Sequence, residues 1–217
     1  MKTLIKICGV TSAQDAFRVS RAVVAFMGLI FAPESPRCVS LSQAAEIVEA
    51  RVPGLLAVGV FQDQSQDFIE RAVSEASLDY LQLHGCESPE LCNALPRPVI
   101  KTITYEPDWT PDQLKAAMAP YLPRENPNIH FLLLDAPKRV AMLPAQRERL
   151  LATFYEDGSL AAIPHFLAGG LTPETVGPLL RAFHPVGVDV ASGVEASVGV
   201  KDPDKLQRFR DAVLQFE

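Results

Sequence analysis

The sequence has few of the features that mark membrane, secreted or nucleic-acid-binding proteins. Its longest apolar run covers residues 22–32, far below the roughly 20 residues that a helix needs to cross a bilayer. Lys6 lies inside the stretch that a secretory signal would keep apolar. Lysine and arginine total 20 against 26 aspartate and glutamate residues, and they form no basic stripe that would hold a nucleic-acid backbone. We therefore expect a cytoplasmic protein whose partners include neither a membrane nor nucleic acid.

Cysteine and histidine are scarce as well. The four cysteines, Cys8, Cys38, Cys86 and Cys92, form no CxxC pair, and the four histidines supply no zinc-finger spacing around them. We expect reduced thiols, no disulfide framework and no metal site. Apolar residues make up 48% of the chain and charged residues 21%, a balance that excludes a disordered or fibrous protein.

Short apolar runs alternate with segments of helical spacing along the whole chain, and no linker or low-complexity tract divides it. We therefore expect one domain, residues 1–217. The runs are nearly continuous, as in strands covered on both faces; they are residues 3–8, 23–31, 55–61, 78–83, 98–104, 129–135, 165–168 and 186–190. Between them, Ser40 with Gln43 forms a capping box, and Pro173 and Pro203 each follow a residue suited to an N-cap.

Eight strand–helix units in 217 residues average about 27 residues each, which is the spacing of a compact (β/α)₈ barrel. The predicted helices include residues 44–52, 65–76, 88–95, 111–121 and 144–155. A doubly wound sheet uses the same units, but it normally has fewer strands and a glycine-rich first turn, which residues 8–11 do not provide. We therefore predict an α/β protein of the TIM-barrel type.

In such a barrel the carboxyl ends of all the strands open onto one rim, where active sites are built. Residues with reactive or anion-binding chemistry stand at these predicted strand ends: Cys8, Arg37, His84, Asp135, Gly169, Gly170, Ser192 and Gly193. Phosphate groups often bind at the loops after the seventh and eighth strands. Each glycine-bearing pair alone also fits a tight turn, but the two together favour phosphate binding at residues 169–170 and 192–193.

Cys8 and Asp135 are the candidates for proton transfer. The thiol of Cys8 is a candidate nucleophile or, as a thiolate, a general base, with an inert buried cysteine as the alternative. Asp135 ends an apolar strand, where loss of water would raise its pKa toward that of a general acid; the alternative is a carboxylate that binds loop amides. A sugar phosphate anchored between the first and sixth strands would meet both groups, the geometry of acid–base isomerisation.

The remaining polar residues at this rim are candidate substrate contacts. The planar guanidinium of Arg37 suits a substrate carboxylate, although a surface arginine in a loop is equally common. His84 follows the fourth strand and Asp189 lies in the eighth. For Asp189 and Glu195 the sequence leaves two interpretations open, contact with ligand hydroxyls or pairing with Lys201.

Together these motifs resemble the phosphoribosylanthranilate isomerase family of tryptophan biosynthesis. The matching segments are residues 6–9 with Thr11, 28–31, 35–37, 58–61, 82–85, 133–135, 167–171 with 173–174, and 187–195 with 201–202. The resemblance implies an aldose–ketose isomerase that acts without metal or organic cofactor. It would convert N-(5-phosphoribosyl)anthranilate to 1-(2-carboxyphenylamino)-1-deoxyribulose 5-phosphate by an Amadori rearrangement.

The same resemblance implies a role for each site residue. Asp135 would protonate the furanose ring oxygen, Cys8 would take the proton from C2, and Arg37 would contact the anthranilate carboxylate. The sequence departs from the family at residues 136–144, which contain no glycine and carry Lys138 and Arg139 where relatives have a glycine-rich loop. A related sugar-phosphate isomerase or epimerase and a non-catalytic phosphate-binding barrel are the alternatives. Both a monomer and a homodimer are compatible with the sequence.

Overall fold

Eight parallel strands close into a barrel in the computed structural model of this protein, which describes residues 2–22, 24–136, 149–152, 155, 158 and 163–216. The strands are β1 (Leu4–Cys8), β2 (Phe26–Ile30), β3 (Leu56–Phe61), β4 (Tyr80–Leu83), β5 (Val99–Thr104), β6 (Ile129–Asp135), β7 (His165–Leu167) and β8 (Gly187–Val190). Each strand pairs with the next one in sequence, and β1 also pairs with β8. The predicted TIM barrel is therefore confirmed, and the doubly wound sheet is excluded.

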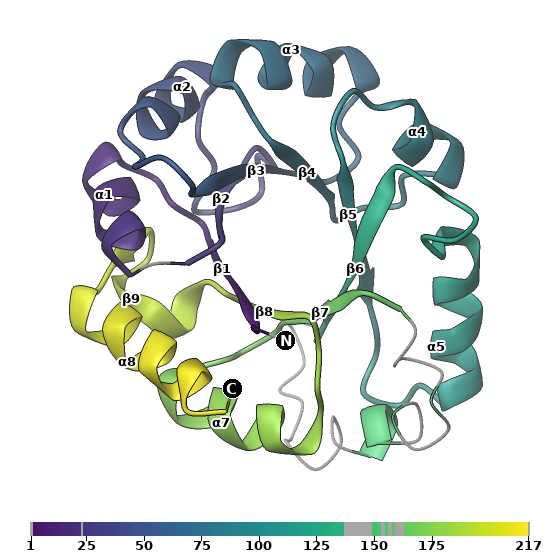
Figure 1. The fold of residues 1–217 in the computed structure, drawn as a ribbon. Helices are drawn as coiled ribbons and strands as arrows, with labels where there is room; N and C mark the ends of the chain where they lie inside the picture. Colours follow the sequence, from purple (N-terminus) through teal and green to yellow (C-terminus); the bar gives the residue numbers. More distant parts are fainter. Residues whose placement is uncertain are drawn as a thin grey trace.

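Helices surround the strands as an outer ring (Figure 1). They are α1 (Ala13–Arg21), α2 (Leu41–Glu49), α3 (Gln66–Ala76), α4 (Pro89–Ala94), α5 (Pro111–Met118), α7 (Pro173–Ala182) and α8 (Pro203–Leu214). Ser40 and Gln43 form the predicted capping box, and Thr172 and Asp202 cap the helices that begin at the following prolines. The predicted helix at residues 144–155 lies mostly outside the described residues; those of its residues that are described, 149–152 and 155, are helical.

Two short elements follow β8 that the sequence pattern did not predict. A 3₁₀ turn, η2 (Ser192–Val194), leads into a hairpin of β9 (Glu195–Ser197) and β10 (Val200–Lys201). The predicted helix at residues 111–121 is also divided, because α5 ends at Met118 and a 3₁₀ turn, η1 (Ala119–Tyr121), follows it. The hairpin brings Lys201 back toward the carboxyl end of β1, where its ammonium donates to the carbonyl of Cys8 at 2.7 Å.

Aromatic side chains fill the lower part of the barrel. Phe26 of β2 packs edge-to-face against Phe131 of β6 and Phe166 of β7, with ring centroids 6.4 and 5.9 Å apart. Such contacts between separated strands require that these side chains point into the barrel. In the β1–β2 register Lys6 pairs with Phe26 and Cys8 with Gly28, so Lys6 and Cys8 also face inward, one layer apart.

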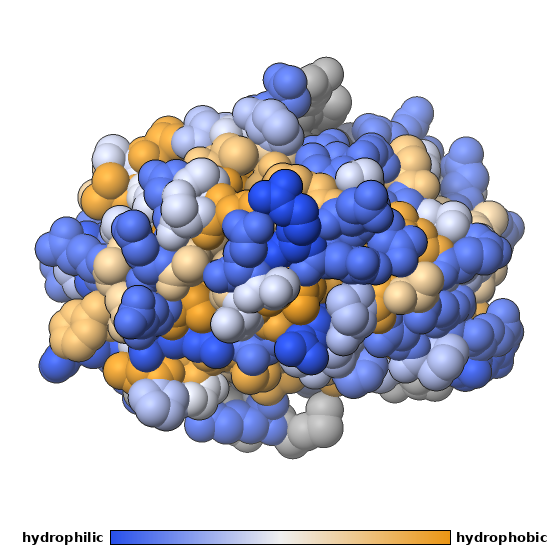
Figure 2. Space-filling view, turned by 90° about the horizontal axis from the view of Figure 1, so that it is seen from above, coloured by the Kyte–Doolittle hydropathy of each residue, from blue (hydrophilic) through white to orange (hydrophobic). Residues whose placement is uncertain are grey.

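No helix in the described part of the chain combines the length and the apolar composition that a membrane crossing requires. The face of the molecule seen in Figure 2 carries hydrophilic and hydrophobic residues intermixed.

Candidate active site

Cys8 lies at the carboxyl end of β1, as predicted, among the side chains of Ile30, Ala32, Val60 and Ala191. It is only 6% exposed. Burial raises the pKa of its thiol, because a thiolate loses its water there, whereas the nearby ammonium of Lys6 acts in the opposite direction. The Cys8 thiol thus combines the burial of a core cysteine with a cationic neighbour that an ordinary core cysteine lacks.

Asp135 ends β6 and is likewise 6% exposed. Its Oδ2 lies 3.5 Å from Nε2 of His84, which follows β4. Gly169, in the loop after β7, has a φ of +87°, and a Cβ there would come within 3.0 Å of Asp135 Oδ1 and within 2.7 Å of the backbone of Ala136. The loop after β7 therefore runs directly past the carboxyl group, and glycine lets it do so.

Polar side chains form the floor between these two groups. Gln82 of β4 donates from Nε2 to Thr102 Oγ1 at 3.1 Å, and the same nitrogen is 3.4 Å from His84 Nδ1. On the other side of the barrel Lys6 donates to Asp189 Oδ1 at 2.8 Å. The rim side of the barrel is therefore polar, above a lower layer that is apolar.

Arg37 lies in a network of buried charges. Its Nε and Nη2 donate to the two carboxylate oxygens of Glu195 at 2.7 and 2.6 Å, and Lys201 Nζ donates to Glu195 Oε1 at 2.8 Å. Burial alone would raise the pKa of Glu195, but the hydrogen bonds from Arg37 and Lys201 lower it below its usual value. Glu195 thus pairs with Lys201, one of the two interpretations that the sequence left open, whereas Asp189 pairs with Lys6 rather than with Lys201.

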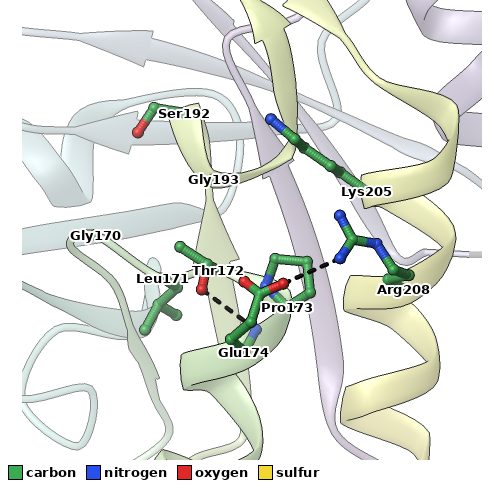
Figure 3. A pocket seen from close by; sticks show the side chains of 9 residues that line it. All are labelled: Gly170, Leu171, Thr172, Pro173, Glu174, Ser192, Gly193, Lys205 and Arg208. Atoms are coloured by element: carbon green, nitrogen blue, oxygen red, sulfur yellow. Dashed lines mark hydrogen bonds and ion pairs between the residues drawn. The ribbon is translucent and has the colours of Figure 1, made fainter.

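The loops after β7 and β8 meet in a pocket of about 400 Å³. Gly170, Ser192 and Gly193 line it, together with Lys205 and Arg208 of α8 (Figure 3). A Cβ on Gly193 would overlap the carbonyl oxygen of Leu171, so the two loops touch at this glycine. Three of the four predicted phosphate residues line this pocket, and the fourth, Gly169, lies beside Asp135.

The electrostatics of the pocket favour an anion. Lys205 Nζ donates to the carbonyl of Glu195 at 2.7 Å, and Arg208 pairs with Glu174 at 3.1 Å. Two cations thus face one carboxylate at the place where the loops meet, next to the first turn of α7, whose positive dipole end also attracts negative charge.

Sequence reasoning missed Lys6, Gln82 and Thr102 as parts of the site. Each is a polar residue within an apolar strand. Each also lies two residues from another polar or reactive residue on the same inward face, as Lys6 lies two residues before Cys8. That period-two pattern is the available signal. The loop that departs from the family, with Lys138 and Arg139, lies outside the described residues.

Among residues 2–136 and the described part of 149–216, histidine, cysteine, aspartate and glutamate side chains form no group of three that suits a metal ion. The described site offers the thiol of Cys8, the carboxyl group of Asp135, the imidazole of His84 and the cations around them.

A family model described as N-(5′phosphoribosyl)anthranilate (PRA) isomerase matches residues 5–212. The N-(5′-phosphoribosyl)anthranilate isomerase of Cellvibrio japonicus is 38% identical over 219 residues, which cover 99% of this chain and 95% of the relative. That of Geotalea daltonii is 37% identical over 210 residues, covering 95% and 94%.

Solved structures of such isomerases have the same fold as this chain. The enzyme from Thermotoga maritima superposes with a TM-score of 0.85 at 29% identity, covering 98% of this chain and 99% of that one. The enzyme from Thermus thermophilus gives 0.80 at 33% identity, covering 99% and 100%. A third, in complex with reduced 1-(o-carboxyphenylamino)-1-deoxyribulose 5-phosphate, gives 0.81 at 30% identity, covering 98% and 99%. These matches confirm the resemblance inferred from the motifs: the chain belongs to the N-(5′-phosphoribosyl)anthranilate isomerase family.

Proposed function

We propose that this chain is an aldose–ketose isomerase of tryptophan biosynthesis that converts N-(5-phosphoribosyl)anthranilate to 1-(2-carboxyphenylamino)-1-deoxyribulose 5-phosphate. One observation supports this most directly: Cys8 and Asp135 end β1 and β6, and the loops after β7 and β8 lie between these strands in the barrel order. An anchored sugar phosphate can then present two of its atoms to two different proton carriers.

Asp135 acts first, as the general acid. It donates its proton to the furanose ring oxygen, the C1–O bond breaks, and the ring opens to a Schiff base. His84, 3.5 Å from Oδ2, and the loop at Gly169 hold the carboxyl group in one orientation. The carboxylate left on Asp135 is then close to the imidazole, which stabilises the negative charge.

Cys8 acts second, as the general base. Its thiolate takes the proton from C2, the electron pair of that C–H bond forms the enolamine, and the enolamine tautomerises to the ketone. No group outside the site gains or loses electrons, so the reaction needs no cofactor. General acid–base catalysis of this kind contributes about 10²–10⁴ in rate per group.

The remaining contacts determine which substrate fits. The pocket at Gly170, Ser192 and Gly193 holds the phosphate, and Arg37 faces the anthranilate carboxylate with its orientation fixed by Glu195. His84 and Asp189, which both reach from the floor of the site, contact the sugar hydroxyls.

A fluorescence assay tests the proposal. Freshly made phosphoribosylanthranilate should lose its fluorescence faster with the purified protein than in buffer, and the gene should rescue a tryptophan auxotroph that lacks this step. Turnover no faster than in buffer would contradict the proposal. Saturable binding of the sugar phosphate without turnover would instead indicate a non-catalytic binder, and a substrate panel would identify a related isomerase or epimerase.

We also propose that residues 1–217 form a single domain, because the first strand of the barrel pairs with the last. A cytoplasmic location stays a prediction. So does the choice between monomer and homodimer, although a relative from Thermotoga maritima is described as dimeric.

A further inference from the structure

Lys6 is a buried ammonium group whose place in the site the proposed mechanism has not used. It has no exposed surface, and it lies on the inward face of β1 one layer below Cys8. Its Nζ is 2.8 Å from Asp189 Oδ1, whose side chain is 11% exposed. A charge that is kept from water needs a compensating partner, and Asp189 supplies one.

Lys6 has a second neighbour, the sulfur of Cys8. A Cβ on Gly28 would lie 2.9 Å from Cys8 Sγ and 3.1 Å from Lys6 Nζ. Both atoms therefore lie next to the space that the missing side chain of Gly28 leaves open. The ammonium acts to lower the pKa that burial raises in the thiol. The glycine at the neighbouring position of β2 thus provides the space in which lysine and thiol meet.

Four charged groups surround the thiol, and they do not act equally. Lys6 favours the thiolate, Asp189 opposes it, and Lys201, whose Nζ binds the carbonyl of Cys8 at 2.7 Å, favours it more weakly. Arg37, the fourth, is neutralised by its two bonds to Glu195. Lys6 is therefore the main cation that counteracts the cost of burying a negative sulfur.

We propose that Lys6 is a positioning residue that makes Cys8 usable as a base, because its ammonium stabilises the thiolate form of the sulfur against the cost of burial beneath the substrate. The inference rests on the proposed role of Cys8. Lys6 does not itself exchange a proton: burial would lower its pKa, but Asp189 and Cys8 together raise it above the ordinary value, so it stays an ammonium throughout.

The proton balance follows directly. When the thiolate takes the C2 proton, an S–H bond forms as the C–H bond breaks, and the electron pair of that C–H bond neutralises the protonated Schiff base to give an uncharged enolamine. Lys6 then keeps Asp189 as its partner. The pair Lys6–Asp189 thus has a fixed charge through the cycle, and only the sulfur gains or loses a proton above it.

Thiol labelling without substrate tests the inference. Iodoacetamide reacts with the thiolate, and mass spectrometry of the peptide that contains Cys8 gives its labelling rate against pH. In Lys6→Met the midpoint should move to higher pH, with a fall of about tenfold or more in the rate at pH 7. In Asp189→Asn it should move to lower pH. The exposed Cys38 in the same samples is the control, because it lies outside this cluster.

Lys6→Met leaves Asp189 without its partner and can cost folding, so the double variant Lys6→Met/Asp189→Asn, which is neutral at both positions, provides a second measurement. Its midpoint should also lie above that of the wild type, because burial of the thiol then acts uncompensated. A Cys8 midpoint equal to that of the wild type in both the single and the double variant would overturn the inference, since a merely structural lysine would not move it.

The two proposals fail in different ways. Normal turnover by Cys8→Ala would remove Cys8 from the mechanism while leaving the titration of the wild-type thiol unchanged. An unshifted titration would remove Lys6 while leaving the mechanism in place.

Discussion

The side chains of Cys8 and Asp135 acquire their proposed chemistry from their neighbours. Each is 6% exposed at the end of its strand. Lys6 is the largest cationic influence on the thiol, and His84 lies 3.5 Å from the carboxyl group. The two-residue spacing of Lys6 and Cys8 is visible in the sequence, but the proximity of His84 to Asp135 is not.

Removing either proton carrier should nearly abolish the reaction. Cys8→Ala and Asp135→Asn each keep the approximate shape of the site, and each should lower kcat by about 10² or more with a small change in KM. Steady-state fluorescence kinetics measure both values. Cys92→Ala is the matched control for the thiol, because Cys92 is buried in the hydrophobic core and its loss should leave kcat unchanged. A variant of Cys8 or Asp135 with near-normal kcat would exclude that residue as a proton carrier.

The positions of the reactive residues could be predicted, but their partners could not. Parallel strands in a barrel bring their carboxyl ends to one rim, so Cys8 and Asp135 were expected to lie at the same rim from strand order alone. The pairing of Lys6 with Asp189 joins residues 183 positions apart, and it depends on the register with which β8 meets β1. No local pattern determines that register.

At the scale of elements, the loops after β7 and β8 form one unit. Gly193 touches the carbonyl of Leu171, and Lys205 of α8 ties the start of the hairpin to the same pocket through Glu195. A change at the contact point therefore moves both loops.

Gly193→Ala should weaken phosphate binding. The added methyl group overlaps the Leu171 carbonyl, so the loops must separate and the pocket loses its shape. We expect KM to rise about tenfold with a smaller effect on kcat, since loss of one good contact costs about 1.4 kcal/mol. Gly54→Ala is the control. Gly54 has a φ of +96°, which strains an alanine, but a Cβ there would meet nothing within 4 Å and the residue precedes β3, so the change should affect stability and leave KM unchanged.

Glu195→Gln tests the orientation of Arg37. The glutamine keeps the size of the side chain but cannot accept two charge-assisted bonds from the guanidinium, and it leaves Lys201 without a carboxylate. KM should rise and kcat should fall less, because Arg37 then samples more orientations. Equal loss of kcat and kcat/KM would show instead that Glu195 acts in the transition state. Glu75→Gln, at a carboxylate of α3 that forms an exposed pair with Arg71, is the matched control for loss of a carboxylate.

The elements themselves followed the sequence closely, with differences that have physical causes. Strand ends differ by a few residues, as at β2, where the predicted strand 23–31 is observed as Phe26–Ile30, because flanking apolar residues such as Val24 and Ala25 are partly buried as well. The β9–β10 hairpin was missed because strands of three and two residues are too short to display a period. The hairpin places Lys201 against Glu195. Because the hairpin was missed, this pairing could be predicted only as one of two interpretations of Glu195.

At the scale of the whole molecule, the barrel is held to its helical layer by buried polar contacts as well as apolar ones. His165 of β7 binds the carbonyl of Ile163 through Nδ1 at 2.7 Å, and its Nε2 lies 2.5 Å from the hydroxyl of Tyr155. Burial lowers the pKa of His165 below its usual 6.5, so the folded protein keeps the ring neutral.

Acid should therefore weaken the fold through His165. Below pH 6.5 the unfolded chain binds a proton on this ring that the folded chain resists, so the free energy of unfolding falls as pH decreases from 6.5 toward the lower folded pKa. Urea unfolding between pH 7.5 and 5 measures the slope. His165→Gln should show a shallower slope, and His130→Gln, at an exposed histidine, should match the wild type. Equal slopes for all three proteins would contradict the prediction.

The barrel closes where β1, its first strand in the sequence, pairs with β8, its last. We expect Cys8 to be an accessible, ordinary thiol until β8 docks against β1 during refolding; in the folded protein it is 6% exposed and lies near the ammonium of Lys6. A brief pulse of alkylating reagent at increasing times of refolding should therefore label a falling share of Cys8, down to the slow labelling of the folded protein, with a time course that differs from the recovery of helical circular dichroism. This one sulfur atom makes it possible to time the final assembly step of the molecule separately from the formation of its helices.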